Sequence, residues 1–341
     1  MNKQPTGFWV LTFVCILFIP NTARAHVRWF VDDLEKYADQ HYTADLTTVL
    51  VTIGALLFII LARAIGLMSN RWKTDEAFDK AFGLTGDVEW RIIAALTGFM
   101  FMAHAAMGIF LAPNLSLPGD GLLLVSRIGQ MALGLLLLSQ ISLALCAVLI
   151  LSFSVLALIY IPLELMIDYL PEFGALFLCF LILGPNMCPL DRRLSKRLKI
   201  DFKRFEHLPL PIIRIGLGLT LIVLSIHNKL LTPALPLAFL DQHNLNFMPY
   251  LGFTGFSNLH FAYSAGVAEL TLGLLLITGV ATRFTATVLA AFFLATLFTI
   301  GSLELTGHAP LFGILLLLAV RGSGSLRLES RARLLGRSSE E

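Results

Sequence analysis

Charged residues are scarce in this chain, and their scarcity excludes several classes of protein. Only 14% of the 341 residues are Asp, Glu, Lys or Arg, against about 25% in an ordinary soluble domain. Hydrophobic residues make up 57%, and the formal net charge is only +2. This composition argues against a disordered chain, an ordinary cytosolic enzyme and a nucleic-acid-binding protein. We therefore expect no nucleic-acid partner.

Cysteine and the common catalytic motifs are equally sparse. The four cysteines include no Cys-x-x-Cys pair, which argues against thiol-relay chemistry, and we expect none of them to form a disulfide outside the cell. The sequence has no phosphate-binding loop, dinucleotide-binding glycine motif, His-Glu-x-x-His motif or nucleophile elbow. A self-contained hydrolase or a nicotinamide-dependent enzyme is therefore disfavoured.

Long apolar runs, by contrast, are abundant and predict an all-α polytopic membrane protein. Residues 1–25 have the features of a cleaved signal peptide, with an uncleaved anchor as the alternative. Residues 26–46 have the spacing of an amphipathic helix at the periplasmic surface. We then expect about nine transmembrane helices, near 47–67, 92–112, 122–140, 143–162, 172–186, 211–228, 262–281, 284–301 and 309–320.

Lysine and arginine are distributed unevenly between the connections, which predicts an orientation. Seven of them fall within 187–210, whereas the connections 113–121, 163–171 and 302–308 have none. Positively charged connections usually remain on the cytoplasmic side. We therefore expect a protein of the bacterial inner membrane, with its mature N-terminus in the periplasm and its C-terminus in the cytoplasm.

Two stretches of the chain share one pattern of four apolar blocks, which predicts two parallel repeats. In both stretches an arginine precedes a histidine by thirteen residues, and a later polar residue precedes a glycine by four. A chance alignment of leucine-rich helices is the alternative. The matched residues are Arg91, His104, Gln130 and Gly134 in the first stretch and Arg214, His227, Glu269 and Gly273 in the second.

These features divide the chain into seven predicted parts. They are a signal peptide (1–25), an amphipathic segment (26–46), an extra transmembrane helix with a cytoplasmic loop (47–90), a first four-helix repeat (91–186), a basic linker (187–210), a second four-helix repeat (211–321) and a basic tail (322–341).

The second repeat contains Arg214-Ile-Gly-Leu-Gly, then His227-Asn-Lys-Leu, then Ala-Glu269 followed by Gly273. In this it resembles the DoxX/DoxD-like family of membrane proteins, over roughly residues 211–321. The first repeat departs from the pattern, since Gln130 stands where the second has Glu269. The resemblance implies a small four-helix membrane unit, and some members of the family are subunits of a thiosulfate:quinone oxidoreductase. A family site would therefore lie in the second repeat.

Ionisable residues gather toward the predicted outer half of the membrane. A carboxylate at such a depth is costly unless it is paired, protonated or hydrated, so Glu269 is a candidate proton acceptor, substrate anchor or metal ligand. The alternative for these residues is interhelical bonding that only fixes the packing, or snorkelling to the headgroups. We predict a catalytic group of Glu269, His227 and Lys229 and a substrate-binding group of His260, Glu304 and His308.

Prolines affect two further groups of polar residues. Glu164, Asp168 and Glu172 have the spacing of one helical stripe, but Pro171 favours a solvated loop instead. Gly307 and Pro310 likewise predict a turn near His308, which makes a metal site there improbable, and we assign none.

Three functions fit these observations. A quinone-linked redox subunit that acts with a partner protein at the periplasmic side is favoured; the sequence does not identify the cofactor, and quinone is one candidate. A transporter or handler of a small solute or metal ion is the first alternative, and a non-catalytic scaffold or assembly factor is the second. A copper site at a free N-terminal His26, completed by His41, is a further option.

Overall fold

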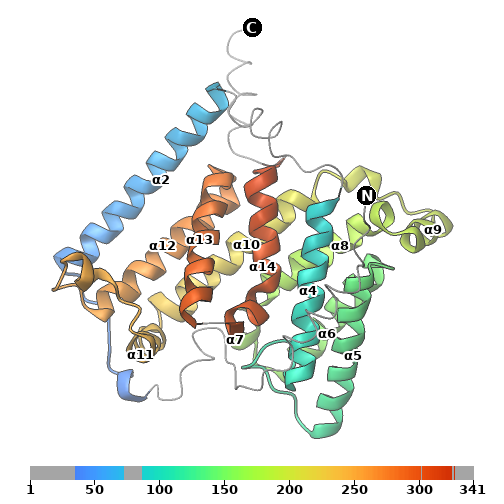
Figure 1. The fold of residues 1–341 in the computed structure, drawn as a ribbon, viewed down its shortest axis with the longest axis horizontal. Coiled ribbons are helices and arrows are strands. Elements are labelled where there is room, and N and C mark those ends of the chain that lie inside the picture. Colours follow the sequence, from blue (N-terminus) through green and yellow to red (C-terminus); the bar gives the residue numbers. More distant parts are fainter. Residues whose placement is uncertain (1–34, 73–86, 301, 325, 327–341) are drawn as a thin grey trace, which may run out of the picture.

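The computed structural model describes residues 35–72, 87–300, 302–324 and 326, and within them it is all-helical (Figure 1). The predicted signal peptide and His26 lie outside these residues. The long helices are α2 (Leu46–Trp72), α4 (Val88–Met107), α5 (Asp120–Ser139), α6 (Leu143–Tyr160), α8 (Leu170–Met187), α10 (Pro209–Ser225), α12 (Asn258–Thr278), α13 (Thr282–Ile300) and α14 (Ser302–Arg321). The short ones are η2 (Glu35–Tyr37), α7 (Leu163–Met166), α9 (Pro189–Leu198), η3 (Lys203–Phe205), η4 (Ile226–Leu230), α11 (Ala234–His243) and η5 (Met248–Leu251).

Seven of the described helices are long and apolar enough to cross a membrane, namely α2, α4, α5, α6, α8, α10 with η4, and α12. The apolar parts of α13 and α14, Thr282–Phe298 and Leu305–Arg321, are shorter. Along α2, large side chains such as Leu57 and Ile60 are more than half exposed, as expected for a surface that faces lipid. The prediction of an all-α polytopic membrane protein is confirmed, whereas the number nine stays a prediction.

From α4 to α13, the described connections between successive long helices fall alternately at two ends of the bundle. One end carries α7, α11 and the 244–257 connection, and we call it the α11 end. The other carries α9 and the 279–281 connection, and we call it the α9 end. The predicted catalytic residues lie toward the α11 end, and most of the basic linker lies at the α9 end.

Two sets of four helices pack in the same way. In the first unit, α4 packs on α5 and α6 on α8; in the second unit, α10 packs on α12 and α13 on α14. The last helix of each unit also packs on the first helix of the other, α8 on α10 and α14 on α4. This arrangement supports the proposal of an internal repeat. The extra helix α2 lies apart, against α12.

Paired glycines let the first two helices of each unit approach closely. A Cβ atom at Gly98 would lie 2.7 Å from the carbonyl oxygen of Gly134, and one at Gly218 would lie 2.8 Å from that of Gly273. Any side chain at these positions would separate the helices. Small residues commonly fulfil this role between membrane helices, where close van der Waals packing drives association.

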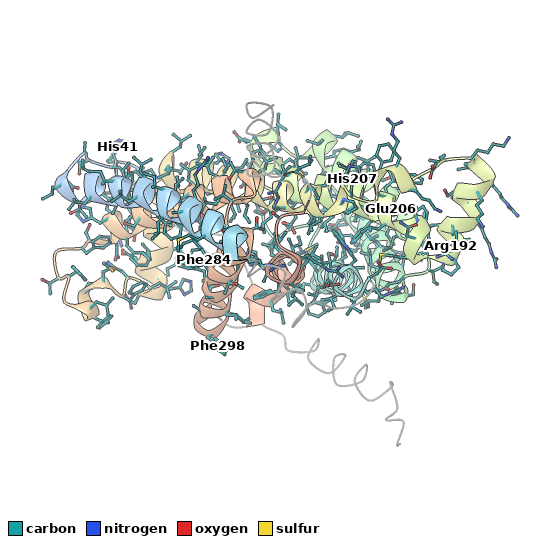
Figure 2. The ribbon with its side chains drawn as sticks, turned by 90° about the horizontal axis from the view of Figure 1, so that it is seen from above. His41, Arg192, Glu206, His207, Phe284 and Phe298 are labelled. Carbon is teal, nitrogen blue, oxygen red and sulfur yellow. The ribbon has the colours of Figure 1, made fainter. Side chains whose placement is uncertain are left out.

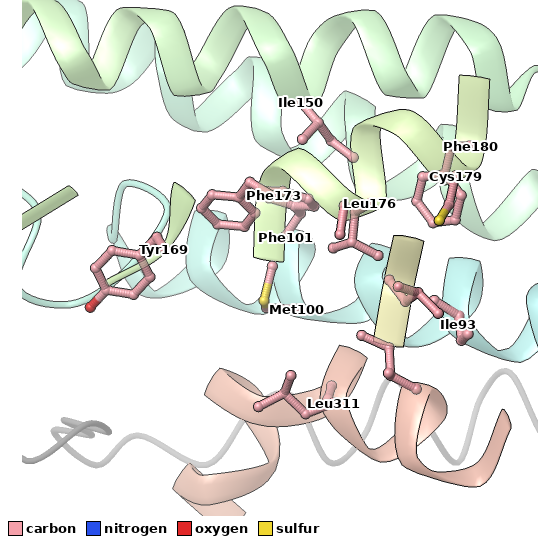
Figure 3. Packing of buried hydrophobic residues seen from close by; sticks show 14 of the residues in the cluster. Ile93, Met100, Phe101, Ile150, Tyr169, Phe173, Leu176, Cys179, Phe180 and Leu311 are labelled. Carbon is pink, nitrogen blue, oxygen red and sulfur yellow. The ribbon is translucent and has the colours of Figure 1, made fainter. Parts of the chain in front are cut away.

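The apolar core lies between the units, where α4, α8 and α14 meet. Phe101 of α4, Phe173 and Leu176 of α8 and Leu311 of α14 are at most 4% exposed (Figure 3). Phe101 and Phe173 stack with their ring centroids 6.2 Å apart. The core therefore joins the two units and does not divide into one core per unit.

Polar contacts at the α9 end also cross between the units. The carboxylate of Glu89 at the start of α4 is fully buried and accepts from Arg321 Nε and Nη2 at 2.7 and 3.0 Å. The carboxylate of Glu206, just before α10, accepts from Asn186 Nδ2 at the end of α8 at 3.0 Å. Each contact therefore links the last helix of one unit to the start of the other.

Two local predictions from the sequence were wrong. α14 continues through Gly307 and Pro310 without the predicted turn, because neighbouring groups in a membrane bundle accommodate the backbone that a proline leaves unbonded. In the described part of the 26–46 segment, the only helical residues before the start of α2 at Leu46 are 35–37. The segment then runs without helix to residue 45, with Tyr37 donating to Asp241 Oδ2 at 2.5 Å and Tyr42 packing on Tyr263.

Candidate functional site

The site is built on a π-helical turn, η4, which ends α10. Within it, the N–H of Leu231 donates to the carbonyl oxygen of Ile226 at 2.9 Å, five residues back. Such turns are rare and frequent at functional sites. This one points the successive polar residues His227, Asn228 and Lys229 at two different partners.

Lys229 pairs with Glu269 of α12, so this carboxylate within a span has an opposite charge beside it. Lys229 Nζ lies 2.7 Å from Glu269 Oε2, and the side chains are 14% and 30% exposed. Glu269 lies about 16 Å along the axis of α12 from Asn258, at 1.5 Å per residue. The pair is therefore inside the span yet open on one side.

Gly266 permits this contact. A Cβ atom at Gly266 would lie 2.9 Å from Leu230 Cδ2 and 3.2 Å from Lys229 Cβ, so a larger residue would displace η4. Ser225 also donates to the carbonyl oxygen of Gly266 at 2.7 Å. From the other side, the hydroxyl of Tyr42 donates to the carbonyl oxygen of Lys229 at 2.9 Å.

His227 and Asn228 turn to the first unit, where both contact Asp168. Asp168 Oδ1 lies 3.1 Å from His227 Nδ1, and its Oδ2 accepts from Asn228 Nδ2 at 3.0 Å. Asp168 is only 3% exposed, so its interpretation as part of a solvated loop was wrong. Pro171 opens α8 instead of breaking a helix, and the short connection after α7 is packed into the bundle.

The predicted substrate-binding residues do not gather at the Lys229–Glu269 pair. His260, in the first turn of α12, lies with Nε2 2.7 Å from Asp45 Oδ2, just before α2. His308, on α14, is buried, with its ring 5.2 Å from Phe293. It interacts electrostatically with His104 and Glu172 of the first unit. The backbone of Glu304 belongs to α14, but its side chain lies outside the described ones.

The Asp45–His260 contact fastens the start of α2 to α12. Hydrogen bonds from the backbone N–H of Thr48 and from His260 lower the pKa of Asp45 from its ordinary 3.8 to about 2. A carboxylate with a lowered pKa favours the folded contact above pH 4, and this contribution is lost as the pH falls toward 2.

We therefore expect the first turn of α2 to lose protection from hydrogen exchange between pH 4 and pH 2 in the native protein. Asp45→Asn should remove this pH dependence, because the amide does not titrate. The measurement is the hydrogen-exchange rate of residues 46–52 in the native protein divided by the rate in Asp45→Asn at each pH. This ratio removes the effect of pH on the intrinsic exchange rate, which is the same in both proteins. A ratio that stays constant over this interval would contradict the assignment.

Metal ligands do not converge in the part of the chain that the structure describes. No group of three or more His, Cys, Asp or Glu side chains there is placed to hold a metal ion. His41, the proposed second ligand of a copper site, is exposed in the segment before α2. The copper option rests on His26 and stays a prediction.

The first unit has a counterpart of this site, with neutral groups in place of charges. Gln130 of α5 accepts from the N–H of Leu111 at 2.7 Å and donates to the carbonyl oxygen of Ile109 at 2.9 Å. Arg127 donates to the carbonyl oxygen of Ala105. Equivalent positions therefore meet in both units. On the first helix of each unit, the spacing of Gly98, Ala105 and Ile109 equals that of Gly218, Ser225 and Lys229. On the second helix, the spacing of Arg127, Gln130 and Gly134 equals that of Gly266, Glu269 and Gly273.

This alignment of α4 with α10 differs from the one predicted in the sequence, which matched Arg91 with Arg214 and His104 with His227. Arg91 precedes Gly98 by seven residues, whereas Arg214 precedes Gly218 by four. The two arginines also differ in surroundings, since Arg91 is exposed and donates to Gln140, whereas Arg214 is fully buried. Helix crossings, and not the Arg–His spacing, therefore define the equivalent positions of α4 and α10.

Comparison with known proteins identifies one family. Residues 210–302 match the DoxX family model, which confirms the resemblance of the second half of the chain. The matched region includes α10, η4, α12 and α13, and with them both Lys229 and Glu269. No curated protein and no solved structure matches the chain.

Proposed function

We propose that this protein is an integral membrane subunit that binds the head group of a quinone at Lys229 and Glu269 and exchanges protons with it. The proposal rests on one observation: an ion pair within the span, 2.7 Å long, whose carboxylate is 30% exposed. Taking both charges of an ion pair out of water costs several kcal/mol per ion, and this carboxylate is only partly buried. A partly exposed pair offers a donor and an acceptor to a hydrophobic ligand that arrives from the bilayer.

The chemistry of a quinone requires both members of the pair. Oxidation of a quinol releases two electrons and two protons, and reduction of a quinone takes up the same numbers. The ammonium group of Lys229 would donate a hydrogen bond to a ring oxygen, and the carboxylate of Glu269 would accept the first hydroxyl proton. His227, the neighbour of Lys229 and in contact with Asp168, supplies a group for the second proton.

Electrons need a separate route. We propose that a partner protein with a haem or iron–sulphur centre takes the two electrons one at a time at the periplasmic side. The α11 end, where η4 and α11 lie, would face that partner. The Lys and Arg residues of α9, at the other end, agree with this orientation.

Titration of a short-chain quinone into the purified protein tests the proposal. Lys229→Met should weaken binding at least about tenfold, because it removes a charge-assisted hydrogen bond. Lys36→Met, which removes an exposed cation that pairs with Asp241, is the matched control and should not change binding. Equal affinities for all three proteins, or no binding by the wild type, would reject the site.

A flux assay distinguishes a solute transporter from a quinone-binding subunit. In proteoliposomes, a solute flux that Glu269→Gln abolishes, in a protein that does not bind quinone, would favour a transporter. A protein that neither binds quinone nor supports flux would favour a scaffold.

A further inference from the structure

The helix α9 stands out from the rest of the bundle in composition and place. Of its ten residues, four are Arg or Lys, and it begins two residues after the span of α8 ends. It therefore lies where that span leaves the hydrocarbon layer. Figures 1 and 2 both place it at the edge of the molecule, on the side away from α2.

One face of α9 is an uncovered leucine stripe. Leu190, Leu194 and Leu198 follow each other at intervals of four, which places them on one side of a helix. They are 50%, 49% and 59% exposed. No other described part of the bundle covers this stripe, which leaves its apolar surface available to the acyl chains of the surrounding membrane.

Three of the four cations of α9 have no carboxylate partner among the described residues. Arg193, Lys196 and Arg197 are exposed, and none of them has a carboxylate partner in the described part of the chain. A helix with an apolar stripe and with cations on its other faces has the composition of one that lies in the surface of an acidic membrane.

The bundle holds α9 in a defined place. The carboxylate of Asp191, 2% exposed, accepts from the hydroxyl of Ser142 and from the N–H of Ala144 at 3.0 Å, at the start of α6. Arg192 donates to the carbonyl oxygen of Asn186 at 2.8 Å. The direction of the leucine stripe is therefore set by α6 and α8.

We propose that α9 is a binding site for acidic phospholipids. Leu190, Leu194 and Leu198 lie among the acyl chains, and Arg193, Lys196 and Arg197 bind the phosphodiester groups of the lipid heads. Each cation near an acidic membrane surface strengthens binding about fivefold. Because α9 lies in the linker between the units, bound lipid stabilises the contact of α8 with α10. The inference does not depend on the proposed quinone site.

The first test measures depth with a fluorophore attached to the full chain in vesicles. Leu194→Cys and the matched control Lys196→Cys lie on opposite sides of α9. Both are made together with Cys15→Ser, and the other native cysteines, Cys146, Cys179 and Cys188, are buried. Nitroxide groups on the acyl chains should quench the fluorophore at position 194 at least about twice as strongly as at position 196, because only the apolar face enters the chains. Equal quenching, with equal access to iodide in water, would overturn the proposal.

The second test measures the headgroup preference. Phosphatidylglycerol vesicles should raise the unfolding temperature above that in phosphatidylcholine for the wild type. For the variant Arg193→Gln/Lys196→Gln/Arg197→Gln the rise should be lost, and its affinity for phosphatidylglycerol should fall at least about tenfold. If the variant retains the full rise, the arginines and lysine do not bind lipid phosphates and the assignment is wrong.

Discussion

Glu269→Gln should lower the rate of quinol oxidation by the complex of this protein with the proposed electron-accepting partner at least about a hundredfold. A positioned general base contributes about 10²–10⁴-fold to a rate, and glutamine keeps the shape of the side chain while removing its basicity. Glutamine also keeps an oxygen that accepts from Lys229 Nζ, 2.7 Å away in the native protein. The fold should therefore survive the substitution.

Two controls make this result specific. Glu269→Asp retains a carboxylate and should recover part of the rate, and Glu164→Gln removes an exposed carboxylate at the same end of the bundle without effect. The measurement is the rate at saturating quinol together with the unfolding temperature of each variant. A Glu269→Gln protein that oxidises quinol at the wild-type rate would show that Glu269 only fixes the packing of α10 on α12.

Asp168→Ala should destabilise the protein by about 1–3 kcal/mol, the cost of a buried group that loses its hydrogen-bond partner. Asn228 is 4% exposed, and its Nδ2 donates to Asp168 Oδ2 at 3.0 Å. Without the carboxylate, η4 loses its contact with the first unit. The position of Lys229 then becomes less defined, so quinone binding should weaken as well.

Asp168→Asn separates the two effects. It keeps an oxygen that accepts from Asn228 but removes the charge beside His227, so it should cost less stability than Asp168→Ala. Thermal unfolding in detergent and hydrogen exchange of residues 226–231 measure the loss, with Glu164→Ala as the exposed control. Unchanged exchange in η4 would mean that Asp168 does not hold this turn.

The apolar runs of the sequence predicted most of the helices, because burial in lipid depends on local composition. The run at 143–162 became α6, and the spans at 47–67 and 211–228 became α2 and α10 with η4. Helix starts were less predictable where polar residues begin them. α12 starts at Asn258, before the expected 262, because the side chains of Ser257 and His260 cap its first turn.

The Lys229–Glu269 contact was foreseeable because both residues lie at similar predicted depth in one unit. The partners of Asp168 were not, since they belong to the other unit and depend on how the units pack. The same holds for the Glu89–Arg321 pair, which joins the first helix of one unit to the last helix of the other. Sequence spacing contains no information on such contacts across the bundle.

Photolabelling with an azidoquinone tests the central claim most directly. The full chain in liposomes is irradiated with the probe, digested and analysed by mass spectrometry, with and without excess unlabelled quinone. We expect label on peptides that contain residues 225–231 and 262–273, suppressed by the competitor and by Lys229→Met. Label that competes with quinone but lies only in the first unit, or label that quinone does not displace, would contradict the account.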